Sequence, residues 1–132
     1  MKRIERLAKS RDFHLCYSQG RVSKGRYIVA HVRPNGMPQS RVGFSVSKKL
    51  GKAVYRNRVK RRLRAIVAHL SHQMADGFDV VISARVAAAD APFQVLTAGV
   101  YDVLCKAGIL SATSPVRKLN SVSEPLKEET SS

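Results

Sequence analysis

The segment VYRNRVKRRLRAIVAHL, residues 54–70, combines a dense positive charge with a regular apolar pattern. On a helical wheel at about 100° per residue, one stripe collects five apolar side chains: Val59, Leu63, Ile66, Val67 and Leu70. The other positions of residues 54–64 are mostly basic. The pattern predicts a helix of roughly 16 to 19 residues whose stripe packs on the rest of the domain and whose outer face is cationic.

The outer face of this helix lacks the acidic residues that usually separate like charges. Arg56 and Lys60, Lys60 and Arg64, and Arg58 and Arg62 are each four residues apart, so each pair repels across one helical turn. A purely structural helix is expected to alternate the signs of its charges. Arginine, which dominates here, favours bidentate contact with phosphate oxygens. The face is therefore predicted to bind phosphate groups.

The predicted phosphate-binding surface extends into the loop before the helix. Residues 48–64 carry nine positive charges, and Gly51 of the loop allows a ligand to approach the backbone closely. This surface, called the basic surface below, comprises Lys48, Lys49, Lys52, Arg56, Asn57, Arg58, Lys60, Arg61, Arg62 and Arg64.

Charge is distributed unevenly along the 132 residues, whose net charge is +15. Residues 1–64 contain 19 Lys and Arg and two acids, whereas residues 65–132 contain five Lys and Arg and seven acids. Such a field attracts polyanions. A membrane partner is not expected, because there is neither an apolar run of about 20 residues nor a long amphipathic helix with large apolar groups. The basic start lacks the apolar region of a secretory signal.

The cysteines and histidines give no pattern typical of a metal or redox site. Cys16 and Cys105 lie far apart without CxxC spacing, so we expect reduced thiols in a cytoplasmic protein. His69 and His72 share a helix face but lack an evident third ligand. No protein-bound metal and no catalytic residue are predicted.

The remaining sequence predicts further helices around a small sheet. Ser10 is expected to cap a helix that stops at Gly20, and Pro92 to begin one that runs to about Lys106. Residues 26–32 and 41–47 have the composition of strands and are predicted to be neighbours.

A third strand and a tail complete the predicted organisation. Residues 78–85, FDVVISAR, indicate a largely buried strand. Residues 1–110 are expected to form one α+β domain, a sheet with helices packed against it, and residues 111–132 a disordered tail rich in Ser, Thr, Pro, Glu and Lys.

Three segments resemble one known family. RVGFSVSKKLGKAVYRNRVKRRLR, residues 41–64, resembles the signature of the protein subunit of bacterial ribonuclease P, whose hallmark is Arg-Asn-Arg at the start of a basic helix, here Arg56, Asn57 and Arg58. Residues 9–21 and 77–85 resemble the first helix and a later strand of that family, and the resemblance covers about residues 3–107. It implies a small two-layer α+β sandwich of a mixed sheet and about three helices, with a left-handed βαβ crossover like that of ribosomal protein S5 domain 2.

The resemblance also implies a function. Family proteins assist a large catalytic RNA, which binds Mg²⁺ and hydrolyses the phosphodiester that joins the 5′ leader to precursor tRNA. The members of the basic surface that would then bind mainly the catalytic RNA are Arg56, Asn57, Arg58, Lys60, Arg61, Arg62 and Arg64. A cleft between the first helix and the sheet would hold the leader. The matching residues in that cleft are Phe13, Tyr17 and His31, although spacing alone would also allow ordinary core packing for the first two and a solvated strand end for His31. Neither DNA nor a membrane is implied as a partner.

Two other classes of function remain open from the residues. A ribosomal protein or general RNA chaperone would explain the charge, but not the Arg-Asn-Arg helix with an aromatic pair upstream. A nuclease that acts alone would need a nucleophile with a nearby base or an acidic cluster, and Glu5 and Asp12 are the only acids of the basic half.

Overall fold

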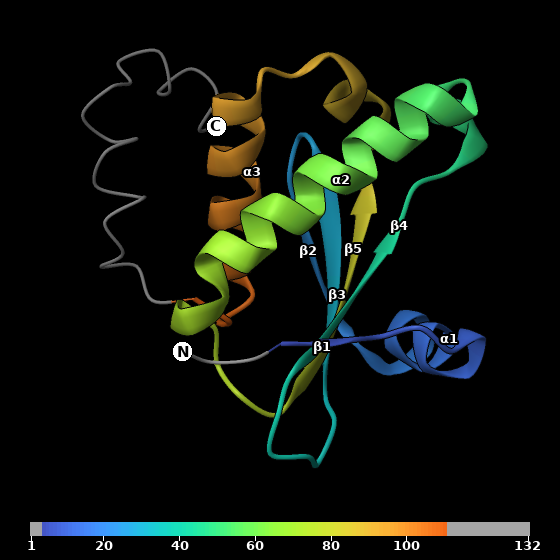
Figure 1. Cartoon of the computed structure of the whole chain (residues 1–132). Coiled ribbons are helices and arrows are strands. Elements are labelled where there is room, and N and C mark those ends of the chain that lie inside the picture. The colour runs from blue at the N-terminus through green and yellow to red at the C-terminus, as the bar shows by residue number, and fades with distance from the viewer. Residues whose placement is uncertain (1–3, 111–132) are drawn as a thin grey trace.

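A mixed sheet runs through the molecule, and its strands are ordered β1–β4–β5–β3–β2 (Figure 1). The computed structural model describes residues 4–110. β1 pairs with β4 and β4 with β5 in parallel, whereas β3 is antiparallel to β5 and to β2. The strands are β1 (Glu5–Arg6), β2 (Arg21–Lys24), β3 (Ile28–Pro34), β4 (Arg41–Ser45) and β5 (Phe78–Ala84).

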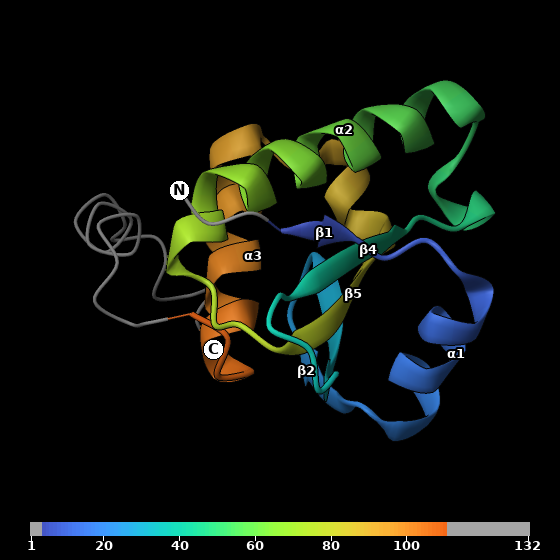
Figure 2. The ribbon, with the colours of Figure 1, turned by 60° about the horizontal axis from the view of Figure 1, so that its bottom comes forward.

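Helices cover both faces of the sheet. α2 (Ala53–Leu70) and α3 (Phe93–Lys106) pack on one face, and α1 (Ser10–Gln19) packs on part of the other (Figures 1 and 2). Short 3-10 helices precede α2, follow it and precede α3: η1 (Lys48–Leu50), η2 (Ser71–Gln73) and η3 (Val86–Asp90). The described residues thus form the expected α+β arrangement with three α-helices.

The parallel strands β4 and β5 are joined through α2. In Figure 1, β4 runs upward, α2 passes in front of the sheet, and β5 runs upward to the left of β4. This is a left-handed βαβ crossover, the rare hand for such a connection. The crossover brings the basic helix over the face that carries the main core.

The main core lies between the sheet and the α2–α3 layer. All five residues of the predicted apolar stripe are buried, so the prediction for α2 is confirmed. β5 is buried on both faces, because Val80 and Ile82 point to this core and Val81 points to a second, small core with Leu7 and Cys16 under α1.

The sheet order corrects one prediction. Strands β3 and β4 are consecutive in sequence but are not neighbours, because β5 lies between them and pairs with both. The two edge strands β1 and β2 were not predicted at all. β1 has only two residues, both charged, and β2 has a single apolar residue among four, so neither carries an apolar alternation.

The ends of α1 also differ from prediction. Ser10 is the first helical residue, the cap position is Lys9, and no side chain caps this end. Gly20 has an extended backbone with φ −81° rather than a left-handed one. Its missing side chain matters for another reason, since a Cβ there would lie 2.5 Å from the carbonyl oxygen of Cys16.

No helix among the described residues is long and apolar enough to cross a membrane. The predicted tail, residues 111–132, lies outside the described residues.

Candidate nucleic-acid interface

The basic surface lies on η1, the turn after it and the outward face of α2. Within it, Arg56, Lys60 and Arg62 are half-buried, and the other predicted members are exposed: Lys48, Lys49, Lys52, Asn57, Arg58, Arg61 and Arg64. The helix contains no acidic residue. The structure therefore presents an uncompensated positive face, as the residue spacing predicted.

Two arginines of this surface also donate hydrogen bonds within the protein. Arg56 Nε donates to the Gly51 carbonyl at 3.2 Å and so tightens the loop onto the helix. Arg62 Nη1 donates to the Ala91 carbonyl at 3.1 Å. The Arg62 guanidinium is thus partly used to hold the segment before α3, which leaves fewer of its donors for a ligand.

The aromatic residues of α1 lie over one row of side chains on the sheet. Register and the alternation of side chains place Gly43, Val81, His31 and Val22 side by side across β4, β5, β3 and β2. Tyr17 is 42% exposed, and its ring meets that of His31 edge-on, with centroids 4.8 Å apart. The predicted pair Tyr17 and His31 therefore meets in space.

Phe13 occupies a different position from Tyr17. It packs with Leu7, Cys16 and Val81, and its ring lies directly on the backbone of Gly43. A Cβ at Gly43 would lie 2.5 Å from the tip of the Phe13 ring, so only glycine accommodates this packing. Phe13 thus packs in the small core and is also partly accessible, because it is half-buried and lines a surface pocket.

His31 is held in an apolar environment by its neighbours. Its Nδ1 is buried and has no hydrogen-bond partner, and burial lowers the pKa of the ring. The neutral form is therefore favoured. A neutral imidazole that lies perpendicular to the Tyr17 ring extends the aromatic surface of α1 onto the sheet.

The next row of the sheet is left uncovered by α1. Ser45, Ser83, Val29 and Lys24 lie side by side across the same four strands, half-buried except for the exposed Lys24. We call this row, with Tyr17 and His31 at its border, the open sheet face. The ring of Tyr27, which precedes β3, packs on α3 at Gly99 and does not belong to this face.

Positive charge also gathers where β4 and β5 end. A surface hollow there is lined by Arg26, Ser47, Lys49 and Arg85, among others. Arg85 Nη1 donates to the Gly25 carbonyl at 3.1 Å, which fixes its side chain against the β2–β3 turn. The open sheet face therefore runs from the aromatic pair toward a cationic end.

An ion network closes the opposite end of the open sheet face and ties α1 to the sheet. Asp79 is fully buried and accepts from Arg41 Nε and Nη2 at 2.8 and 2.7 Å and from Asn35 Nδ2 at 3.0 Å. Arg41 Nη1 also lies 3.4 Å from Asp12 of α1. Burial alone would raise the pKa of Asp79, but the hydrogen bonds from Arg41 and Asn35 and the charges of Arg41 and Arg33 outweigh burial and lower it.

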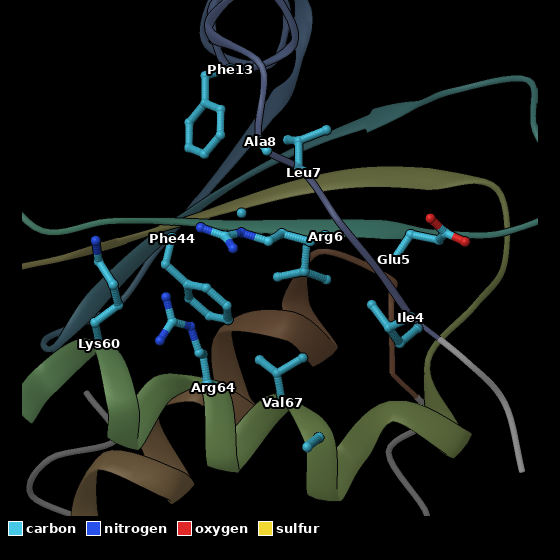
Figure 3. A pocket seen from close by; sticks show the side chains of 13 residues that line it. Ile4, Glu5, Arg6, Leu7, Ala8, Phe13, Phe44, Lys60, Arg64 and Val67 are labelled. Atoms are coloured by element: carbon cyan, nitrogen blue, oxygen red, sulfur yellow. The ribbon is translucent and has the colours of Figure 1, made fainter. Parts of the chain in front are cut away.

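A pocket at the edge of the sheet is lined by residues of both α1 and α2. Its volume is about 290 Å³, and it lies between β1, α2 and the end of β4 that extends past β1. Figure 3 shows Phe13 reaching into it from α1, and Lys60 and Arg64 from α2, with Arg6 and Phe44 between them. Residues from the predicted basic surface and the predicted aromatic set thus line one cavity.

Sequence reasoning missed several cations and one aromatic residue of these surfaces. Arg6 and Phe44 line the edge pocket, and Arg26 and Arg85 the cationic end. The excess of charge in residues 1–64 was the available signal for Arg6 and Arg26. It did not single them out, because their positions depend on strand order rather than on local spacing.

Neither cysteine is in a disulfide. Burial, followed by the nearby charge of Asp79, raises the pKa of Cys16 to about 11, so this thiol stays protonated at neutral pH. Among residues 4–110, no three His, Cys, Asp or Glu side chains come together as metal ligands would.

Comparison with known proteins places this arrangement in one family. The ribonuclease P family model matches residues 1–108. The ribonuclease P protein component of Symbiobacterium thermophilum is 44% identical over 112 residues, which cover 83% of this chain and 96% of that protein. That of Caldanaerobacter subterraneus subsp. tengcongensis is 40% identical over 105 residues, 80% of this chain and 90% of that protein.

Solved structures agree with the sequence comparison. The Staphylococcus aureus RNase P protein superposes with a TM-score of 0.76 at 30% identity, covering 83% of this chain and all of that one. The Thermotoga maritima RNase P protein superposes with a TM-score of 0.72 at 33% identity, covering 77% of this chain and 96% of that one. The chain belongs to the ribonuclease P protein family.

Proposed function

We propose that this chain binds the catalytic RNA of ribonuclease P through its basic surface and the 5′ leader of precursor tRNA through the open sheet face. The observation that carries the proposal is the position of the two surfaces. The uncompensated cations of α2 and the aromatic residues of α1 lie on either side of the end of β4, where Phe13, Lys60 and Arg64 line one pocket. One RNA assembly can therefore contact both surfaces at once.

The open sheet face suits a single strand of variable sequence. Tyr17 and His31 offer ring surfaces at one border, and Arg26 and Arg85 offer phosphate contacts at the far end. Stacking on an aromatic side chain contributes roughly 1 to 3 kcal/mol per base and tolerates any base. A precursor would then bind more tightly than mature tRNA, because only the precursor has a leader to fill this face.

The chemistry of cleavage is assigned to the RNA partner and its Mg²⁺ ions. The acids nearest the open sheet face, Asp79 and Asp12, already neutralise Arg41. The role left to this chain is to hold the leader and to stabilise the catalytic RNA. Maturation of tRNA by such an enzyme places the protein in the cytoplasm, with neither DNA nor a membrane as a partner.

The proposal is tested by cleavage of precursor tRNA by the cognate catalytic RNA at low magnesium, with and without the protein. We expect the protein to restore cleavage, and the Arg58→Ala/Arg61→Ala variant, which changes two exposed residues, to need more protein for the same rate. The wild-type affinity for the catalytic RNA should fall with salt at a log-log slope of about −4 to −6, for about six to eight phosphate contacts.

Two outcomes would favour other functions. Stimulation that ignores the leader would indicate a general RNA-binding protein or chaperone. Cleavage by the purified protein without RNA would indicate a nuclease that acts alone.

A further inference from the structure

The edge pocket between β1, the end of β4 and α2 lies apart from the open sheet face that we assign to the leader, although Phe13, one of the predicted leader-binding residues, lines it. It faces the side of β4 that lies away from β5, whereas the open sheet face spans β4, β5, β3 and β2. It also lies beside α2 rather than on the outer end of the basic surface at η1. The pocket is therefore a candidate binding site separate from the open sheet face and from the outer end of the basic surface.

Backbone groups are left unpaired at this edge. Glu5 and Leu7 donate their N–H groups to the carbonyls of Ser40 and Val42, and the chain then turns away into α1. In a parallel sheet, the backbone groups of alternate residues point to the same neighbouring strand. The N–H and C=O of Phe44 therefore point, like those of Val42, to the β1 side of β4, where the chain has already turned away. Across the described residues, no backbone hydrogen bond from β1 reaches Phe44.

Two aromatic rings lie beside these backbone groups. Phe13 rests on Gly43 immediately before Phe44, and its ring lines the pocket from above in Figure 3. Phe44 is half-buried and lines the pocket from the strand. A flat ligand in this space would meet an aromatic surface and a backbone donor and acceptor at the same place.

The entrance of the pocket is cationic. Figure 3 shows the side-chain nitrogens of Arg6, Lys60 and Arg64 around the ring of Phe44, whereas the Glu5 carboxylate points away. None of these three cations makes a side-chain hydrogen bond or ion pair with another residue in the part of the chain that the structure describes. Their charges are available to an anionic ligand.

We propose that the edge pocket binds one unpaired nucleotide of RNA. The base lies against Phe13 and Phe44 and bonds through its edge to the Phe44 peptide, while Arg6, Lys60 and Arg64 contact the flanking phosphates. The volume, about 290 Å³, is at the lower end for ligand sites and suits one nucleotide rather than a longer stretch. The inference rests on the proposed function only in taking RNA as the partner, and the nucleotide comes from either the catalytic RNA or the leader.

Site-directed crosslinking tests the proposal and identifies the source. A photoreactive group attached to Ala8→Cys, an exposed residue that lines the pocket, would probe the nucleotide. The same group on Gln94→Cys, exposed on α3 and outside the pocket, is the control. Each protein is assembled with the catalytic RNA alone, with mature tRNA and with precursor tRNA. A single crosslinked position in the catalytic RNA in all three assemblies assigns the site to that RNA, and one that needs the precursor assigns it to the leader.

A matched pair of charge variants gives an independent readout. Arg6→Gln should weaken binding of the RNA identified above by about tenfold, the effect of one charge-assisted hydrogen bond. Arg11→Gln removes the same charge from an exposed position of α1 outside the pocket and should have a much smaller effect. Equal effects of the two variants, together with no position-specific crosslink from Ala8→Cys, would overturn the inference. If the protein still restored low-magnesium cleavage, the proposed function would stand without this site.

Discussion

Replacement of Arg41 by methionine should destabilise the protein strongly, although the Arg41 side chain is 21% exposed. Its guanidinium donates to both carboxylate oxygens of Asp79, at 2.8 and 2.7 Å, and Asp79 is fully buried. The variant keeps most of the side-chain volume but leaves the buried carboxylate without its main partner. It also removes the 3.4 Å contact with Asp12 that links α1 to the sheet.

The size of the expected loss in the free energy of unfolding depends on the partners that Asp79 keeps in the variant. Loss of one partner of a buried ion pair costs about 3 to 5 kcal/mol. Asn35 still donates at 3.0 Å, Arg33 lies 3.8 Å away, and the Arg41 side chain is 21% exposed. These features favour the lower end, about 3 kcal/mol. At about 4 °C per kcal/mol for a domain of this size, the Tm should fall by about 12 °C.

Thermal unfolding followed by circular dichroism measures this change. Arg33→Met is the matched control, because it removes a cation that lies 3.8 Å from the same carboxylate and is 25% exposed, and it should cost less than about 1 kcal/mol. The double variant Arg41→Met/Asp79→Leu should recover part of the loss, since no unpaired charge remains buried. Equal Tm values for Arg41→Met and Arg33→Met would refute the reasoning.

Acid should reduce the contribution of the Arg41–Asp79 ion pair to the free energy of unfolding. The pKa of Asp79 lies below its ordinary value of 3.8, so its contribution to stability is present above that value and is lost as the pH falls through the folded-state pKa. The gap in stability between the wild type and Arg41→Met should therefore narrow in acid. A gap that stayed constant down to pH 2 would contradict the assignment of the carboxylate as the ionised partner.

Three further changes have defined outcomes. Gly43→Ala should cost about 1 to 3 kcal/mol in urea unfolding, because its Cβ would lie 2.5 Å from the Phe13 ring. Burial lowers the pKa of His31 below 6.5, so the free energy of unfolding should decrease as the pH falls below that value, and His31→Gln should lessen this decrease. Cys16, buried and with its pKa raised to about 11, should resist iodoacetamide at pH 8 in the native protein, whereas the half-buried Cys105 reacts first.

The helix that carries the basic surface was predictable because its signal is local and long. Five apolar residues repeat with helical spacing over residues 59–70, and all are buried in the observed helix, Ala53–Leu70. β5 was predictable for a similar reason, since Val80, Val81 and Ile82 form a continuous apolar run that is buried on both faces. The local sequence pattern therefore predicted α2 and β5, two of the three elements of the crossover.

The relative placement of the elements depends on long-range pairing, which local spacing does not encode. Tyr17 and His31 meet only because the register of β3 places His31 beneath α1. The edge pocket exists because β1 pairs with β4 for only two residues, so that Phe44 has no neighbouring strand on the side away from β5. A two-residue strand of charged residues has no apolar pattern, so neither the strand nor the pocket could be predicted from spacing.

The most direct test of the division between the two surfaces is the affinity of the assembled holoenzyme for precursor and for mature tRNA, measured for the wild type and Tyr17→Ala. Tyr17 is exposed, so the variant should fold. We expect a loss of about 5- to 140-fold in affinity for the precursor, the effect of one stacked base, with no change for mature tRNA. An equal loss for both tRNAs, or no loss for either, would contradict the assignment of the open sheet face to the leader.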